Sequence, residues 1–285
     1  MSNRGEKVVL VLGGGGIKGM AHIGACQAIR EAGIEVSEIV GTSIGGLVGA
    51  TLAGGDSVEV LHQKALELKR ANLVTVNRWA VLLNGIRQQS LFRGDVFTSY
   101  VESVLPVDSF AELSMPVTMN AVDLATGETV WLGAGGDSSV SITTAVVASC
   151  ALPVFYPPVE LNGRFLVDGG VNDNLPIVFA AERGADRIIA IDVGAGIDND
   201  AEKIVGQGMV AIHHRVVEIM GYPRKLQRLA SWQGPPMIYV RPRIEGYSTF
   251  EFGRTDFFIE EGYRATKEAL ARGPESSATL RRFEA

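Results

Sequence analysis

The 285-residue sequence has little of what marks several large classes of protein. It holds two cysteines, Cys26 and Cys150, which are too few for a disulfide framework or for a zinc site of the usual spacing. Both lie in apolar surroundings with a helical pattern, so we expect buried free thiols. Such thiols fit a reducing compartment.

Long hydrophobic runs are also missing. The first apolar run, at residues 8–12, stops at glycines and is too short for the core of a signal peptide. No stretch reaches the ~18 apolar residues that indicate a membrane-spanning helix. We therefore expect a cytoplasmic protein, and peripheral contact with the inner membrane surface stays open.

Basic residues are fewer than acidic ones. The sequence has 26 Lys and Arg residues and 32 Asp and Glu residues, which gives a net charge of −6. A protein whose main partner is nucleic acid needs a basic face, so we do not expect nucleic acid as the partner. The hydrophobic content of 46% is enough for a sizeable core without disulfides or metals.

The order of predicted elements indicates an α/β protein. The chain begins with a predicted strand at 7–12, a glycine loop at 13–16, a helix at about 17–32, a strand at 38–41 and a buried helix at 44–52. This alternation implies a parallel sheet covered by helices. We predict a three-layer α/β/α sandwich with a mainly parallel central sheet. We find no linker, and predict one domain over 1–285, with a core at about 7–194 and its C-terminal part at 195–285.

Further elements follow along the chain. Helices are predicted at 57–71, 95–105, 141–149, 176–183 and 256–271, and strands at 116–123, 128–132, 159–161, 164–167, 187–193 and 237–240. Asn162 and Gly163 between two of these strands form a strong hairpin signal. Pro176 is expected at the first position of its helix.

Two glycine motifs near the start of the chain point to different proteins. "GGGIKG" at 14–19 has the spacing of a dinucleotide-binding loop, and "GTSIG" at 41–45 has that of a serine hydrolase elbow. Dinucleotide binding also needs an acidic residue at the end of the next strand, to bind the ribose. That strand ends in "EIVGTS", with Ser43 in place of the acid, so the dinucleotide motif lacks its second half.

Ser43 stands where a serine hydrolase needs its nucleophile. Gly41 and Gly45 let a strand and a helix approach closely around a sharp turn. The start of a helix also favours negative charge, because its first N–H groups are free.

The glycine loop complements this elbow. Acyl transfer creates an oxyanion, which backbone N–H groups stabilise well. We predict that Gly14, Gly15 and Gly16 present such amides beside Ser43.

The serine also needs a base. The chain has four histidines, which are His22, His62, His213 and His214. The order Ser, Asp, His of ordinary α/β-hydrolases would select His213 or His214. However, the elbow follows only the second strand here, and "VAIHHRVVEIM" has the pattern of a helix interior.

Asp168 is the alternative base. It begins "DGG" at 168–170, at the end of a hairpin arm. A carboxylate can accept the serine proton directly when burial raises its pKa from about 3.9. The competing interpretation is that Asp168 only caps the turn.

Taken together, the motifs "GGGIKG", "GTSIG" and "DGG", in that order, strongly resemble those of the patatin-like phospholipase family. The stretch "AVVASCALPVFYPPVELNGRFLVDGGVNDNLPI" is similar to the corresponding part of that family, and the resemblance covers about 8–194. It implies a Ser–Asp dyad of Ser43 and Asp168 without a catalytic histidine, and no metal or organic cofactor. The resemblance also marks a set of supporting residues, which are Lys18, Gly19, Gly41, Gly45, Gly169 and Gly170.

The resemblance implies a serine acyl hydrolase that cleaves lipid esters at a membrane or micelle surface, of the phospholipase A or lysophospholipase type. Two alternatives stay open, an esterase for small soluble esters and a non-catalytic regulatory protein that kept the fold. Lys18 lies where the family often has a basic residue. It would either contact a lipid phosphate or be an ordinary surface lysine.

The segment 77–92 mixes apolar side chains with arginines. This composition is typical of an interfacial segment that covers a site in water and opens at a lipid surface. A helix packed on the core is the alternative interpretation.

Overall fold

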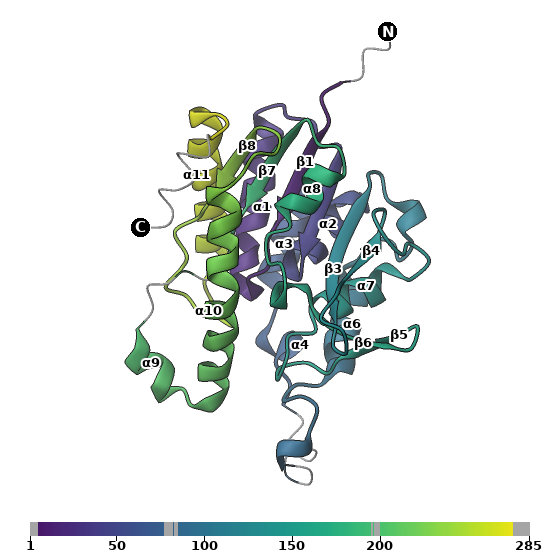
Figure 1. The fold of residues 1–285 in the computed structure, drawn as a ribbon, viewed down its shortest axis with the longest axis vertical. Helices are drawn as coiled ribbons and strands as arrows, with labels where there is room; N and C mark the ends of the chain where they lie inside the picture. Colours follow the sequence, from purple (N-terminus) through teal and green to yellow (C-terminus); the bar gives the residue numbers. More distant parts are fainter. Residues whose placement is uncertain (1–4, 77–81, 83–84, 195, 197–199, 276–285) are drawn as a thin grey trace.

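The structure is a computed structural model that describes residues 5–76, 82, 85–194, 196 and 200–275 (Figure 1). Three of the apolar residues on which the interfacial hypothesis for 77–92 rests, Trp79, Val81 and Leu83, lie outside the described residues. That hypothesis therefore stays a prediction.

A central sheet of eight strands runs through the molecule in the order β5-β6-β3-β2-β1-β7-β8, with β4 paired to β3. The pairs β3–β2, β2–β1, β1–β7 and β7–β8 are parallel, whereas β4, β5 and β6 form antiparallel pairs. The strands are β1 Val8–Leu12, β2 Glu38–Thr42, β3 Val117–Asp123, β4 Thr129–Gly133, β5 Val159–Leu161, β6 Arg164–Asp168, β7 Arg187–Ile191 and β8 Met237–Val240.

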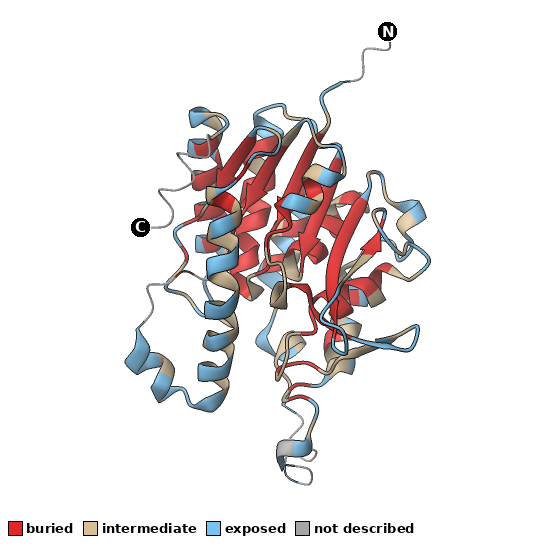
Figure 2. Cartoon of the chain, in the orientation of Figure 1, coloured by how far each residue is buried: buried red, intermediate tan, exposed pale blue. Residues whose placement is uncertain are grey.

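Helices cover both faces of this sheet, so the predicted three-layer architecture with a mainly parallel sheet is confirmed (Figure 1). Side chains of a strand point alternately to its two faces. Leu10 and Leu12 of β1 belong to a core formed with α1, α2, α3, α7 and α11. Val9 and Val11 belong to a second core, to which α8 and the end of α10 contribute. Burial on both faces explains why β1 and β8, and β7 after Arg187, are continuous apolar runs (Figure 2).

The helices are α1 Ala21–Glu31, α2 Ile44–Ala53, α3 Val58–Glu67, α4 Arg70–Leu73, α6 Gly94–Val104, α7 Ile142–Ser149, α8 Ile177–Glu182, α9 Ala201–Gly206, α10 Met209–Ala230 and α11 Thr255–Arg272. Short 3-10 helices are η1 Gly16–Met20, η2 Gly85–Arg87, η3 Phe110–Glu112 and η4 Gly169–Val171. No helix in the described part of the chain is both long and apolar enough to cross a membrane.

Three helix boundaries differ from the sequence prediction. The helix predicted at 57–71 is interrupted because Leu68 and Lys69 have extended backbones, and this bend allows Leu68 to pack against the core. The helix predicted from residue 17 begins instead as the 3-10 helix η1. Pro176 lies one residue before α8 rather than at its first position.

Candidate active site

Strand β3 brings Ser43 and Asp168 to the same place. β2 runs parallel to β3 up to the pair Thr42–Asn120, and Ser43 follows at once. The next residue of β3, Ala121, pairs with Asp168 at the end of β6. β4 pairs along one edge of β3. β2 and β6 therefore share the other edge, where β2 pairs as far as Asn120 and β6 pairs from Ala121 onward. The serine and the carboxylate are therefore neighbours across the sheet, although 125 positions separate them in the sequence.

Ser43 occupies a strained turn between β2 and α2. Its φ of 54° and ψ of −123° lie in a region that residues other than glycine rarely adopt. The flanking glycines are required by space. A Cβ on Gly45 would lie 2.1 Å from the Leu12 carbonyl oxygen, and one on Gly41 would lie 2.5 Å from the Gly46 nitrogen. The elbow geometry predicted from "GTSIG" is present.

Asp168 is buried at the end of β6. Burial raises the pKa of its carboxyl group to about 6, and this effect outweighs the Gly170 N–H, the Ser43 hydroxyl and the charge of His214, which all lower it. The Gly170 N–H donates to Asp168 Oδ1 at 2.7 Å. Asp168 thus caps the turn, as one interpretation held, and in addition is a buried carboxylate whose pKa is raised toward neutral pH.

The glycine loop between β1 and η1 lies beside Ser43, but its amides are not equivalent. The Gly14 N–H, predicted to be an oxyanion donor, instead donates to the Asn174 carbonyl oxygen at 3.1 Å. Within the described chain, nothing accepts a hydrogen bond from the Gly15 or Gly16 N–H. Gly16 has a φ of 60°, which favours glycine. Two of the three predicted amides are therefore available to an oxyanion.

Asn174 was not anticipated from the sequence. Its Nδ2 donates to the Gly14 carbonyl oxygen at 2.9 Å while its own carbonyl accepts from the Gly14 N–H. These two bonds join the glycine loop to the loop that follows Asp168. The only signal in the sequence was the position of Asn174 six residues after Asp168.

Lys18 on η1 is buried, with 2% of its surface exposed. The interpretation as an ordinary surface lysine is therefore wrong. Burial lowers the pKa of Lys18, and the amine has neither an ion pair nor a hydrogen bond to any residue that the structure describes. A buried cation without a partner is costly, so Lys18 is a candidate for contact with an anionic group.

One cavity of about 160 Å³ connects these groups. Ser43, Asp168, Lys18 and the glycine loop line it. Its apolar wall consists of Leu47, Leu68, Leu73, Phe97, Tyr156 and Phe250, and α10 contributes mainly polar side chains, which include His214, Glu218, Lys225 and Arg228.

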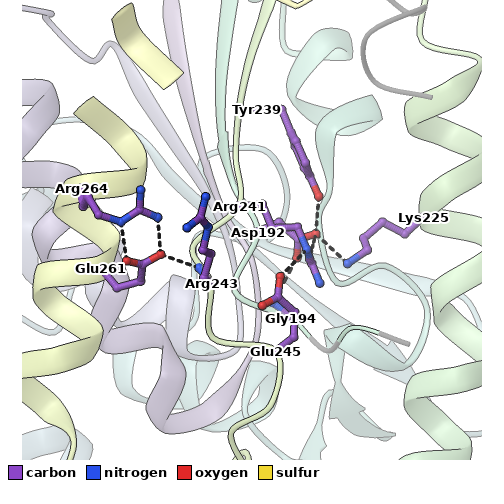
Figure 3. Close-up of polar contacts among 9 residues, drawn as sticks. All are labelled: Asp192, Gly194, Lys225, Tyr239, Arg241, Arg243, Glu245, Glu261 and Arg264. Atoms are coloured by element: carbon purple, nitrogen blue, oxygen red, sulfur yellow. Dashed lines mark hydrogen bonds and ion pairs between the residues drawn. The ribbon is translucent and has the colours of Figure 1, made fainter. Parts of the chain in front are cut away.

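Ionic contacts hold α10 against the cavity. Asp192 after β7 accepts hydrogen bonds from Lys225 Nζ at 2.6 Å and Arg241 Nη1 at 2.6 Å, and the Tyr239 hydroxyl donates to it at 2.7 Å (Figure 3). Burial alone would raise the pKa of Asp192, but Lys225 and Arg241 hold it well below its usual range. Lys225 thereby ties α10 to the sheet.

A family model described as "Patatin-like phospholipase" matches residues 10–181. The chain belongs to the patatin-like phospholipase family. Lysophospholipase nte1 of Aspergillus fumigatus is 30% identical over 287 residues, a match that covers 94% of this chain and 18% of that protein. The human Patatin-like phospholipase domain-containing protein 6 is 29% identical over 286 residues, with coverage of 92% and 20%. The patatin-like chain thus spans about a fifth of the length of these relatives.

The crystal structure of VipD from Legionella pneumophila matches this patatin-like fold with a TM-score of 0.58. The match covers 95% of this chain and 67% of that chain at 16% sequence identity. At that identity the likeness concerns the fold alone.

The four histidines of this patatin-like chain have different surroundings. His22 is buried, with Nε2 2.7 Å from the Gly13 carbonyl oxygen, and burial lowers its pKa to about 4. His213 is exposed, and His62 is half-buried. His214 lies in the interior of α10, as predicted, yet it lines the cavity, where its Nε2 is 2.8 Å from Thr249 Oγ1. The sequence placed His214 in a helix but gave no sign that this helix borders the site.

Proposed function

We propose that this chain is a serine acyl hydrolase that cleaves carboxylic esters of lipids, of the phospholipase A or lysophospholipase type. The observation that carries the proposal is the register on β3, which places a strained elbow serine and a buried carboxylate of raised pKa on one cavity. Membership of the patatin-like phospholipase family and the lysophospholipase name of a relative support it.

The reaction uses Ser43 as nucleophile and Asp168 as base. Ser43 Oγ attacks the ester carbonyl carbon while the Asp168 carboxylate accepts the hydroxyl proton. The N–H groups of Gly15 and Gly16 stabilise the oxyanion of the tetrahedral intermediate. The intermediate then expels the alcohol, which takes the proton from Asp168, and leaves an acyl group on Ser43.

Water completes the cycle. A water molecule attacks the acyl carbonyl and gives a proton to Asp168. The second intermediate then releases the fatty acid, and Asp168 returns the proton to Ser43 Oγ. A base with a pKa of about 6 is mainly ionised at pH 7 and is stronger than an exposed aspartate. Burial of Asp168 therefore serves the proton transfer.

The cavity lining supports a lipid substrate. Its leucines and aromatic rings suit an acyl chain, and the unpaired Lys18 suits the phosphate of a head group. The substrate is met at a membrane or micelle surface, and two buried thiols fit the cytoplasm, with the inner membrane face as the place of contact. The modest cavity volume also favours a second candidate, an esterase for small soluble esters.

A comparison of two substrates tests the proposal. Wild-type protein and Ser43→Ala are assayed with p-nitrophenyl butyrate and with vesicles that contain lysophosphatidylcholine. We expect the wild type to release fatty acid from the vesicles and Ser43→Ala to be inactive on both. Cleavage of the butyrate alone would support the esterase, and no cleavage of either would support a regulatory protein. Activity retained by folded Ser43→Ala would refute Ser43 as nucleophile.

A further inference from the structure

Three consecutive residues at the end of α7 contact both Ser43 and Asp168. The Ser43 N–H donates to Ser149 Oγ at 2.9 Å. The Asp168 N–H donates to the Ala151 carbonyl oxygen at 3.0 Å. Between them, Cys150 lines the cavity, and burial raises the pKa of its thiol, an effect that the Ser43 hydroxyl only partly offsets. The segment 149–151 therefore links the backbones of the two proposed reacting groups.

The position of this segment follows from the packing of α7. Ser141 caps the start of the helix, since its Oγ accepts the Thr144 N–H at 3.0 Å. The helix ends at Ser149, shortly before Pro153. Its apolar side chains belong to the core between the sheet and α2. A serine at a helix end commonly bonds to its own backbone. Ser149, which is 0% exposed, instead accepts from the neighbouring elbow.

The bond to Ser149 matters because the Ser43 backbone is strained. A non-glycine residue with a φ of 54° keeps that conformation only where several contacts enforce it. In addition, a buried N–H group without an acceptor destabilises the folded protein. The Ser149 hydroxyl oxygen supplies this acceptor, so it favours the strained conformation over a relaxed one.

We propose that Ser149 is a positioning residue for the reaction. Its hydroxyl fixes the backbone of Ser43, and the same segment fixes Asp168 through Ala151, so the serine hydroxyl and the carboxylate keep a constant separation. The inference rests on the proposed function, because it takes Ser43 and Asp168 as the reacting groups. Displacement of a reacting group by about 1 Å can reduce a rate by about 100-fold.

Two substitutions at Ser149 separate hydrogen bonding from packing. Ser149→Ala removes the acceptor and leaves a small void, whereas Ser149→Cys fills nearly the same space with a poor acceptor. We expect both to lower kcat on p-nitrophenyl butyrate by about 10- to 100-fold, with KM nearly unchanged. The rate at which a fluorophosphonate labels Ser43 is expected to fall to a similar extent.

Ser141→Ala is the matched control. It is the same substitution at the other end of α7, and it removes a cap without touching the elbow. We expect a lower Tm with kcat retained. Wild-type kcat and labelling in Ser149→Cys would overturn the positioning role, even if Ser149→Ala were impaired or failed to fold. A loss of kcat in both Ser149 variants no larger than that of Ser141→Ala at an equal drop in Tm would overturn it too. Activity retained by Ser43→Ala would overturn the proposed function itself.

Discussion

The two walls of the cavity are held in place by different forces. The wall that carries Ser43 and Asp168 is built on the paired strands β2, β3 and β6 of the apolar core, so backbone pairing fixes the two proposed reacting groups. The opposite wall is α10, in which Leu229 is the only buried residue among 22, and which ionic contacts hold (Figure 2). Arg228 Nη1 lies 2.6 Å from Asp173 Oδ2, and Lys225 binds Asp192.

This difference assigns separate tasks to the two walls. Catalytic groups need sub-ångström positioning, which a packed core with paired strands supplies. A wall held by charges depends on pH and salt, and its polar side chains face whatever occupies the cavity. We call the wall that carries Ser43 and Asp168 the packed wall, and α10 the ionic wall. We expect changes in the packed wall to affect the chemical step. Changes in the ionic wall or at Lys18 are expected to affect stability and substrate preference.

Asp168→Asn breaks the packed wall at its most sensitive point. The amide keeps the shape of the side chain but cannot accept the serine proton. We expect kcat on a soluble ester to fall on the order of 10⁴-fold, as for the base in other serine hydrolases. The measurement is steady-state kinetics together with circular dichroism of the variant. A folded variant within tenfold of wild-type kcat would refute Asp168 as the base.

The pH dependence of the wild type gives a second test of the same group. Burial raises the pKa of Asp168 to about 6, and only the ionised carboxylate accepts a proton. On a neutral ester, kcat/KM is therefore expected to be constant above that pH and to fall about tenfold per pH unit below it. A profile that stays flat down to pH 4 would contradict this assignment.

Asp192→Asn breaks the ionic wall. It leaves the charges of Lys225 and Arg241 without their buried partner, so we expect the free energy of unfolding to fall by about 3 kcal/mol. Glu59→Gln, at the exposed pair with Arg30, is the control and is expected to change it little. Urea unfolding measures both.

The sign of the pH effect on the ionic wall follows from the lowered pKa of Asp192. The stabilisation is present above the unfolded-state pKa of about 3.9 and is lost as pH falls through the lower pKa of the folded state. Equal stability of Asp192→Asn and the wild type near pH 7 would show that the cluster contributes no net stability.

Lys18→Met tests how the substrate is selected. The methionine fills the same space without charge. We expect kcat/KM on lysophosphatidylcholine to fall about 10- to 100-fold, because a hydrogen bond to a charged group contributes about 1.5–3 kcal/mol. Activity on p-nitrophenyl butyrate, which has no phosphate, is expected to change little. Lys267→Met on the exposed face of α11 is the control. Equal losses on both substrates would refute a phosphate contact.

The sequence was sufficient where the chemistry is local. The elbow around Ser43 and the hairpin that leads to Asp168 are set by neighbouring glycines, so their motifs predicted both the turn and the residue that it presents. The alternating strands and helices likewise predicted the three layers. Each of these features depends on contacts within a few residues or on simple periodicity.

The sequence was insufficient where distant segments meet. The Gly14 amide is taken by Asn174, 160 positions away, which no local pattern reveals. Lys18 follows a glycine loop that is typical of a surface, and only the packing of α10 and the loop at Thr249 buries it. The same packing brings His214 to the cavity. Burial of a polar side chain is a tertiary property, so periodicity within its own helix gives little information about it.

His214 provides the smallest expected effect, because it belongs to the ionic wall and not to the proposed dyad. Its Nε2 contacts Thr249 and lies 3.4 Å from Glu218 Oε1, so its ring is occupied by structural partners. In His213→Ala/His214→Ala we expect kcat on a soluble ester within about threefold of wild type, since Asp168 accepts the proton directly. His62→Ala, at a half-buried position of α3 that does not line the cavity, serves as the control. A loss comparable to that of Asp168→Asn would instead assign the base to the ionic wall, as in a Ser–His–Asp triad, and the division of tasks between the two walls would fail.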